Sequence, residues 1–193
     1  AFCRPGIGSE ALWESHHYRV LADGYPRCAG HVLLVTKEHL PSHMQAAEEW
    51  LEEFERAQDL VRRFLEETFG GAAFYENGGA RQEVPHAHLH GLPFEPLVPQ
   101  KWLKAGRLER IGGWSDAREE CRRSGHYFYL EAGEDRFLVR DYGYILSRVR
   151  GQLVDQTEAR LDPRTGRMVR GGPEMVQRTA ALWRRWSAAT NPG

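Results

Sequence analysis

The sequence predicts an α+β fold in which an antiparallel sheet packs against one long helix and continues into a C-terminal α/β extension. Residues 18–21 and 31–36 are rich in apolar and β-branched side chains and flank the turn Asp23-Gly24-Tyr25-Pro26, so they predict two neighbouring strands. Over residues 50–69, large apolar side chains recur at steps of three and four, which predicts an amphipathic helix. Gly70 and Gly71 predict its end.

The same signals predict the later elements. In chain order these are a strand over 72–76, a turn at Asn77-Gly78-Gly79, a strand over 85–92, a short helix over 115–123 opened by a cap at Ser115, a hairpin of strands 127–131 and 136–140, a helix over 144–153, a loop over 161–172 and a final helix from Pro173. We expect the additions after residue 95 to cover one edge of the sheet.

Composition excludes several protein classes. The chain of 193 residues is within the range of a single domain. It has no apolar run of about 20 residues and no leader-like start, so we expect a soluble, cytoplasmic protein without a membrane partner. Three cysteines, Cys3, Cys28 and Cys121, argue against a disulfide framework. The front half is acidic and the back half basic, but the arginines are scattered and form no clear nucleic-acid stripe.

The segment His86-Ala87-His88-Leu89-His90 carries the strongest chemical signal. Side chains alternate along a strand, so the three imidazoles are predicted to project from one face while Ala87 and Leu89 point to the other. A stability-driven strand would use valine or isoleucine there, because three neighbouring imidazoles need matched donors and acceptors. The pattern therefore predicts a functional site.

Two chemistries fit a row of imidazoles. Three histidines with an open coordination position could hold a catalytic metal ion. Alternatively, one imidazole could attack phosphorus while its neighbours bind the phosphate oxygens. The residues alone leave both open.

The segment resembles the His-x-His-x-His motif of the histidine-triad (HIT) superfamily, whose members hydrolyse or transfer nucleotides. Residues 23–39 are similar to the strand-turn-strand segment of that family, including Gly30-His31 at the start of the second strand and Lys37-Glu38-His39 at its end. The resemblance covers about residues 1–95, so we expect a HIT core over 1–95 and a C-terminal elaboration of the same domain over 96–193.

The resemblance favours phosphoryl chemistry and implies roles for individual residues. His88 would be the nucleophile that forms a nucleotidyl-imidazole intermediate, while His90 would bind phosphate oxygens and His86 would orient the pocket. Asp23 would contact the ribose, and Asn77 and Gln82 would complete the substrate contacts. No cofactor would be required for the chemistry, and dinucleoside polyphosphates are the leading substrate class.

Two residues depart from the family pattern. Glu83 stands where many relatives have a serine, and a carboxylate facing phosphate is repulsive unless it is protonated, paired or turned away. This motivates an alternative in which the protein binds nucleotide with little turnover, and a metal-dependent hydrolase is a third possibility. Gly91 replaces an apolar residue of the family, from which we expect only a packing effect.

Some relatives hold a structural zinc ion, and the chain resembles them in part. Ala1-Phe2-Cys3 is similar to the end of their Cys-x-x-Cys, so Cys3, His39 and His86 would be the zinc ligands. Dimerisation is common in the family and is expected here by that analogy. Arg148 could approach a phosphate, although an exposed salt bridge is the simpler expectation.

Overall fold

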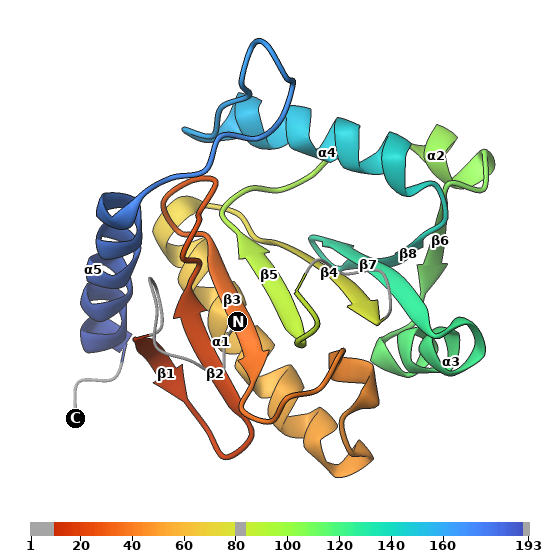
Figure 1. Cartoon of the computed structure of the whole chain (residues 1–193), viewed down its shortest axis with the longest axis horizontal. Coiled ribbons are helices and arrows are strands. Elements are labelled where there is room, and N and C mark those ends of the chain that lie inside the picture. The colour runs from red at the N-terminus through yellow and green to blue at the C-terminus, as the bar shows by residue number, and fades with distance from the viewer. Residues whose placement is uncertain (1–9, 80–83, 191–193) are drawn as a thin grey trace.

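In the computed structural model, which describes residues 10–79 and 84–190, strands from both halves of the chain form one antiparallel sheet (Figure 1). The eight strands are ordered β1-β2-β3-β5-β4-β7-β8-β6. The strands are β1 (Ala11–Glu14), β2 (Tyr18–Ala22), β3 (Val32–Thr36), β4 (Ala73–Gly79), β5 (His88–Leu92), β6 (Leu108–Ile111), β7 (His126–Ala132) and β8 (Asp135–Val139). The helices are α1 (Leu51–Phe69), α2 (Gln100–Lys104), α3 (Trp114–Ser124), α4 (Tyr142–Gln156) and α5 (Pro173–Thr190), with 3-10 turns at His43–Gln45 and Glu48–Trp50.

Helix α1 covers one face of the sheet, as its apolar periodicity predicts. Phe54, Val61 and Phe64 are fully buried in a core that also holds Leu89 of β5. The helix ends at Gly70, whose φ of 86° is left-handed and therefore suits glycine. Helices α3 and α5 contribute to the same core, α5 through Trp183 and Trp186 that contact Phe64.

Helices α2 and α4 cover part of the opposite face. They lie next to each other at the top of Figure 1, and Trp102 of α2 contacts Tyr144 of α4. Their apolar side chains share a second core with strands β7 and β8. Helices α2 and α4 therefore border one side of the sheet face that carries His88 and His90.

The predicted turn at Asn77-Gly78-Gly79 is wrong. These residues continue β4, where Asn77 pairs with Phe128 and Gly79 with His126 of β7. Gly78 lies against the ring of Tyr127, where an added Cβ would come within 2.4 Å, so these glycines serve close packing rather than a reversal. The later strands cover one edge of the sheet, as expected, because β7 pairs along the whole of β4 and β8 and β6 follow it.

The other elements follow the sequence with local differences. Strands β2 and β3, helices α1, α4 and α5, and the β7–β8 hairpin lie where the patterns predict them. The expected serine cap is wrong, because α3 begins at Trp114 and the carboxylate of Asp116 binds the Gly112 amide instead. The sequence patterns did not predict strands β1 and β6 or helix α2. Within the described residues, no helix combines the length and apolarity needed to cross a membrane.

Candidate active site

Strand β5 presents His88 and His90 on one face and packing residues on the other. Leu89 is buried against α1, and Gly91 faces the same helix. A Cβ at Gly91 would stand 3.0 Å from Val61 Cγ1, so the absence of a side chain allows α1 to approach the strand. The expected packing role of Gly91 is therefore confirmed.

His86 does not continue this row, which corrects the expectation of three imidazoles on one strand face. β5 begins only at His88, because the amide of Ala87 donates to the Leu40 carbonyl (2.6 Å) rather than joining the β3–β5 ladder. The His86 side chain is 1% exposed, and its Nε2 lies 2.8 Å from the Thr36 carbonyl oxygen. Its ring meets that of His39 edge-on at 5.0 Å between centroids.

A backbone carbonyl fixes the tautomer of His88. Its Nδ1 lies 2.6 Å from the carbonyl oxygen of His86. Since a carbonyl can only accept, Nδ1 carries the hydrogen and the neutral ring keeps its lone pair on Nε2. The ring geometry therefore suits a nucleophile, which needs an unprotonated ring nitrogen.

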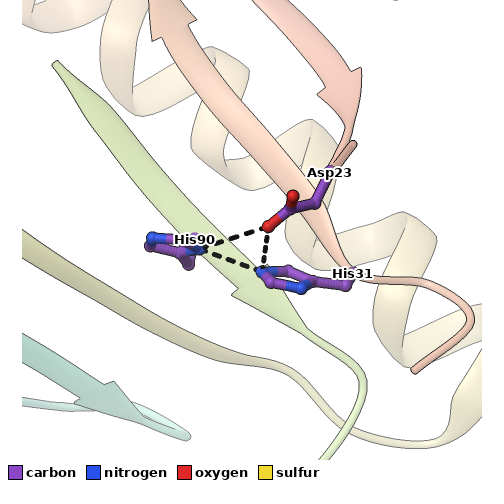
Figure 2. A group of neighbouring side chains, drawn as sticks. All are labelled: Asp23, His31 and His90. Carbon is purple, nitrogen blue, oxygen red and sulfur yellow. Dashed lines mark hydrogen bonds and ion pairs between the residues drawn. The ribbon is translucent and has the colours of Figure 1, made fainter. Parts of the chain in front are cut away.

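A chain of hydrogen bonds fixes His90 through a second imidazole, that of His31 (Figure 2). The amide of Arg27 donates to His31 Nδ1 (3.2 Å), so the hydrogen of neutral His31 lies on Nε2. His31 Nε2 lies 2.9 Å from His90 Nδ1 and 3.3 Å from Asp23 Oδ2. His90 thus accepts at Nδ1, which places its own hydrogen on Nε2 as a donor.

Burial keeps these imidazoles neutral. Desolvation lowers the pKa of His31, against the opposing effect of the Asp23 carboxylate. Desolvation lowers the pKa of His90 well below its ordinary value, and His88, His31 and Arg27 act in the same direction. Burial likewise lowers the pKa of His86, although the Thr36 carbonyl opposes it. Neutral rings are the forms that the hydrogen-bond chain requires.

Tyr75 supports His90 from the neighbouring strand. The two residues are paired between β4 and β5, and their rings stack with centroids 4.2 Å apart and planes inclined by 7°. Such a stack restricts the rotation of the imidazole. His31 and Tyr75 were missed as site residues, although the Gly-His pair that contains His31 is part of the sequence resemblance.

The predicted substrate contacts lie at different distances from His90. Asp23 Oδ2 is 3.9 Å from His90 Nδ1, and its Oδ1 accepts from the Tyr25 amide at 2.7 Å. Asn77 lies on β4 two residues after Tyr75, so its side chain lies on the same face of that strand as Tyr75, which is paired with His90. Gln82 and Glu83 lie outside the described residues.

The predicted zinc ligands are only partly visible. His39 and His86 lie together, while Cys3 is outside the described residues. The Nε2–H of His86 is directed to the Thr36 carbonyl, so Nδ1 is the atom that could bind a metal ion. The donor chemistry of this pair therefore fits a zinc site.

A different group, Asp23, His31 and His90, has ligand atoms close enough together to hold a metal ion, within the part of the chain that the structure describes. The Arg27 amide argues against that use of His31. A metal-binding imidazole normally donates its other N–H, whereas His31 Nδ1 accepts one and leaves the hydrogen on the nitrogen that would face the ion. The hydrogen-bond chain is therefore the better description of this group.

Arg148 does not form the expected salt bridge with any residue that the structure describes. Its guanidinium lies over the ring of Tyr144, 5.3 Å from the ring centroid, and the Arg107 guanidinium is 3.5 Å from the same centroid. Arg27, which sequence reasoning did not select, lies closer to the histidines and influences their charge. It also donates to the Met168 carbonyl at 3.3 Å, which ties the loop before α5 to the Asp23 turn.

Comparison with known proteins finds a family match over the part of the chain that contains the histidine segment. The family model of the HIT domain matches residues 4–97. Solved structures with similar folds include a histidine triad nucleotide-binding protein from Sulfolobus tokodaii (23% identity, covering 60% of this chain and 81% of that one, TM-score 0.40). Another is a Zn-bound histidine triad family protein from Mycobacterium smegmatis (25% identity, covering 47% of this chain and 66% of that one, TM-score 0.40). A third is a HIT family member from Bacillus subtilis (18% identity, covering 59% of this chain and 86% of that one, TM-score 0.41).

Among curated proteins, none matches the chain. The sequence match, however, spans the strand-turn-strand segment, α1 and the histidine segment, which are the parts that build the site. Through the domain at residues 4–97, the chain belongs to the HIT superfamily.

Proposed function

We propose that the protein is a nucleotide hydrolase or nucleotidyltransferase that cleaves a phosphoanhydride or phosphoramidate bond through a nucleotidyl-His88 intermediate. The observation that carries the proposal is the 2.6 Å hydrogen bond from His88 Nδ1 to the His86 carbonyl. It puts the lone pair of the neutral ring on Nε2, and the His88 ring lies on the face of β5 opposite the one that packs against α1.

The reaction would proceed in two displacements. The Nε2 lone pair of His88 forms a bond to phosphorus as the bond to the leaving group breaks, and the leaving group keeps that electron pair and takes up a proton. Water, or an acceptor in a transferase, then attacks phosphorus, and His88 recovers its lone pair when the P–N bond breaks. Splitting one displacement into two is the advantage of covalent catalysis.

His90 would stabilise the charge that develops on phosphate. Two hydrogen bonds, from the Arg27 amide to His31 and from His31 to His90, fix the hydrogen of His90 on Nε2. The His90 ring can therefore donate this hydrogen without rearranging. Donors that are oriented before the reaction contribute more than donors that must reorient. Asp23 would bind the ribose, and Asn77 would contact phosphate beside His88.

Dinucleoside polyphosphates are the proposed substrate class. The family resemblance supports this choice. Helices α2 and α4 of the C-terminal half also border the sheet face on which the leaving group would lie. A homodimer and a cytoplasmic location also remain predictions from the resemblance and the composition.

The test is a screen of dinucleoside polyphosphates, nucleoside phosphoramidates and nucleotide sugars, followed by rapid quenching and mass spectrometry of the protein. We expect a nucleotide adduct on His88, and we expect His88→Ala to lose the adduct and at least about a thousandfold in turnover. His16→Ala, which removes an exposed histidine between β1 and β2, is the matched control. Tight nucleotide binding without product would instead favour the binding protein that Glu83 suggested, and unchanged turnover in His88→Ala would exclude the mechanism.

A further inference from the structure

The C-terminal half adds aromatic side chains to the sheet face that carries His88. Asn77 is paired with Phe128 across β4 and β7, and opposite residues of antiparallel strands share a face. Asn77 and Phe128 therefore lie on the same sheet face as Tyr75, which is paired with His90. Because neighbouring strands are about 4.8 Å apart and β4 lies between β5 and β7, the strand of Phe128 is about 10 Å from the strand of the histidines.

A second aromatic ring lies next to that of Phe128. Tyr142, the first residue of α4, meets Phe128 edge-on with centroids 4.7 Å apart. Its side chain is 46% exposed, although Ile145 and Val149 of the same helix are buried against the sheet. Tyr75 stacks between Phe128 and His90, so the rings are continuous from the histidines to α4.

The two sides of the histidine pair differ in character. On the β3 side, Asp23 and His31 offer the polar groups proposed to hold the transferred nucleoside. On the β4 side lie the amide of Asn77 and the aromatic rings of Phe128 and Tyr142. Arg27 and Arg150 lie near enough to oppose the rise that burial causes in the pKa of Tyr75, so positive charge accompanies the rings.

We propose that Phe128 and Tyr142 form a leaving-group subsite that stacks the second nucleobase of a dinucleoside polyphosphate. The inference rests on the proposed function, which places the reacting phosphate at His88. Both residues lie beyond the matched domain of residues 4–97, so the C-terminal half would supply this specificity. Stacking tolerates any planar base, and the separation of about 10 Å between β5 and β7 leaves room for phosphates between the histidines and the ring.

The experiment compares two substrates that transfer the same nucleotide. One is a dinucleoside triphosphate, and the other is a nucleoside triphosphate with a methyl ester on its terminal phosphate, which has the same phosphates but no second base. We expect Tyr142→Ala to lower kcat/KM for the first substrate by about fivefold or more. The methyl ester should react within about twofold of the wild-type rate if stacking is the lost interaction.

Tyr142→Phe is the matched control, because it keeps the ring and should retain the preference for the dinucleotide. Phe128→Leu provides a second variant with a side chain that still fills space. Equal losses with both substrates, or no loss with either, would overturn the subsite.

Equilibrium binding separates this inference from the proposed chemistry. If neither substrate is turned over, the proposed function fails, and calorimetry with the dinucleotide and the corresponding mononucleotide still tests the subsite. Weaker dinucleotide binding by Tyr142→Ala, with unchanged mononucleotide binding, would support it. Equal affinities in wild type and variant for both ligands would overturn it.

Discussion

The two faces of β5 are built from alternating residues of the same five-residue strand, yet one face packs against a helix and the other carries the candidate active site. Leu89 and Gly91 face α1, where their size decides how closely the helix packs. His88 and His90 face the other way, where hydrogen bonds to a backbone carbonyl and to His31 decide their tautomers. Substitutions on the first face should therefore change stability, and substitutions on the second should change chemistry.

The largest expected effect on stability comes from Leu89→Ala. Leu89 is fully buried, so its loss should lower the free energy of unfolding by about 2–5 kcal/mol, because the core around α1 closes only partly on the cavity. Urea unfolding would measure this against His88→Ala, for which we expect a change below about 1 kcal/mol. A comparable loss in both variants would contradict the division between the two faces.

Gly91→Ala should be less damaging than the leucine truncation. The new methyl group would meet Val61 Cγ1 at 3.0 Å and Val32 Cγ2 at 3.1 Å, so α1 or β3 must shift slightly. Overpacking of this kind lowers the free energy of unfolding by about 1–3 kcal/mol. Replacing glycine also restricts the unfolded chain, which raises the free energy of unfolding by up to about 1 kcal/mol. We expect a net destabilisation of about 1 kcal/mol, measured by urea unfolding, with kcat unchanged. A stabilised variant would show that this contact is looser than the distances indicate.

Tyr75→Leu tests the other face of the sheet. Loss of the stack on His90 should lower kcat/KM by about 2- to 12-fold, which corresponds to about 0.5–1.5 kcal/mol for an aromatic pair. Tyr75→Phe keeps the ring and should retain activity, since the stack does not need the hydroxyl. Equal activity of the leucine and wild-type proteins would mean that His31 alone positions His90.

The smallest expected effect is a pH dependence of stability at a place remote from β5. Burial acts to raise the pKa of Glu53, but hydrogen bonds from the His17 amide and from the Ser15 and His17 side chains outweigh it and lower the pKa to about 2. Between pH 4.5 and about 2 the unfolded chain therefore binds more protons at this group than the folded protein does. The stabilisation is present above the ordinary pKa and is lost as the pH falls through about 2.

Thermal unfolding of wild type and Glu53→Gln would measure this contribution. We expect wild type to be more stable at pH 7 and the difference to shrink steadily as the pH falls from 4.5 toward 2. A difference that does not change with pH would show that Glu53 contributes through packing rather than through its charge.

Much of the fold could be predicted because its signals are local. The apolar period of α1, the Pro173 start of α5 and the alternating strands are properties of neighbouring residues, and the structure has them in place. The turn predicted at residues 77–79 was wrong because glycine is typical of turns. Here Gly78 instead leaves space for the Tyr127 ring of β7. That neighbour lies about fifty residues away, and no local pattern indicates it.

The sequence by itself determined which residues are proposed to carry the chemistry, because the spacing of His86, His88 and His90 and the strand-turn-strand segment before them can be recognised along the chain. Only the tertiary structure decided which ring nitrogens hold hydrogen, since the partners are a carbonyl two residues away, the Arg27 amide and His31. Strand pairing likewise brought Tyr75 beside His90 and Phe128 beside Tyr75. The physical reason is that alternation fixes the face of a side chain, whereas hydrogen-bond partners depend on which strands become neighbours.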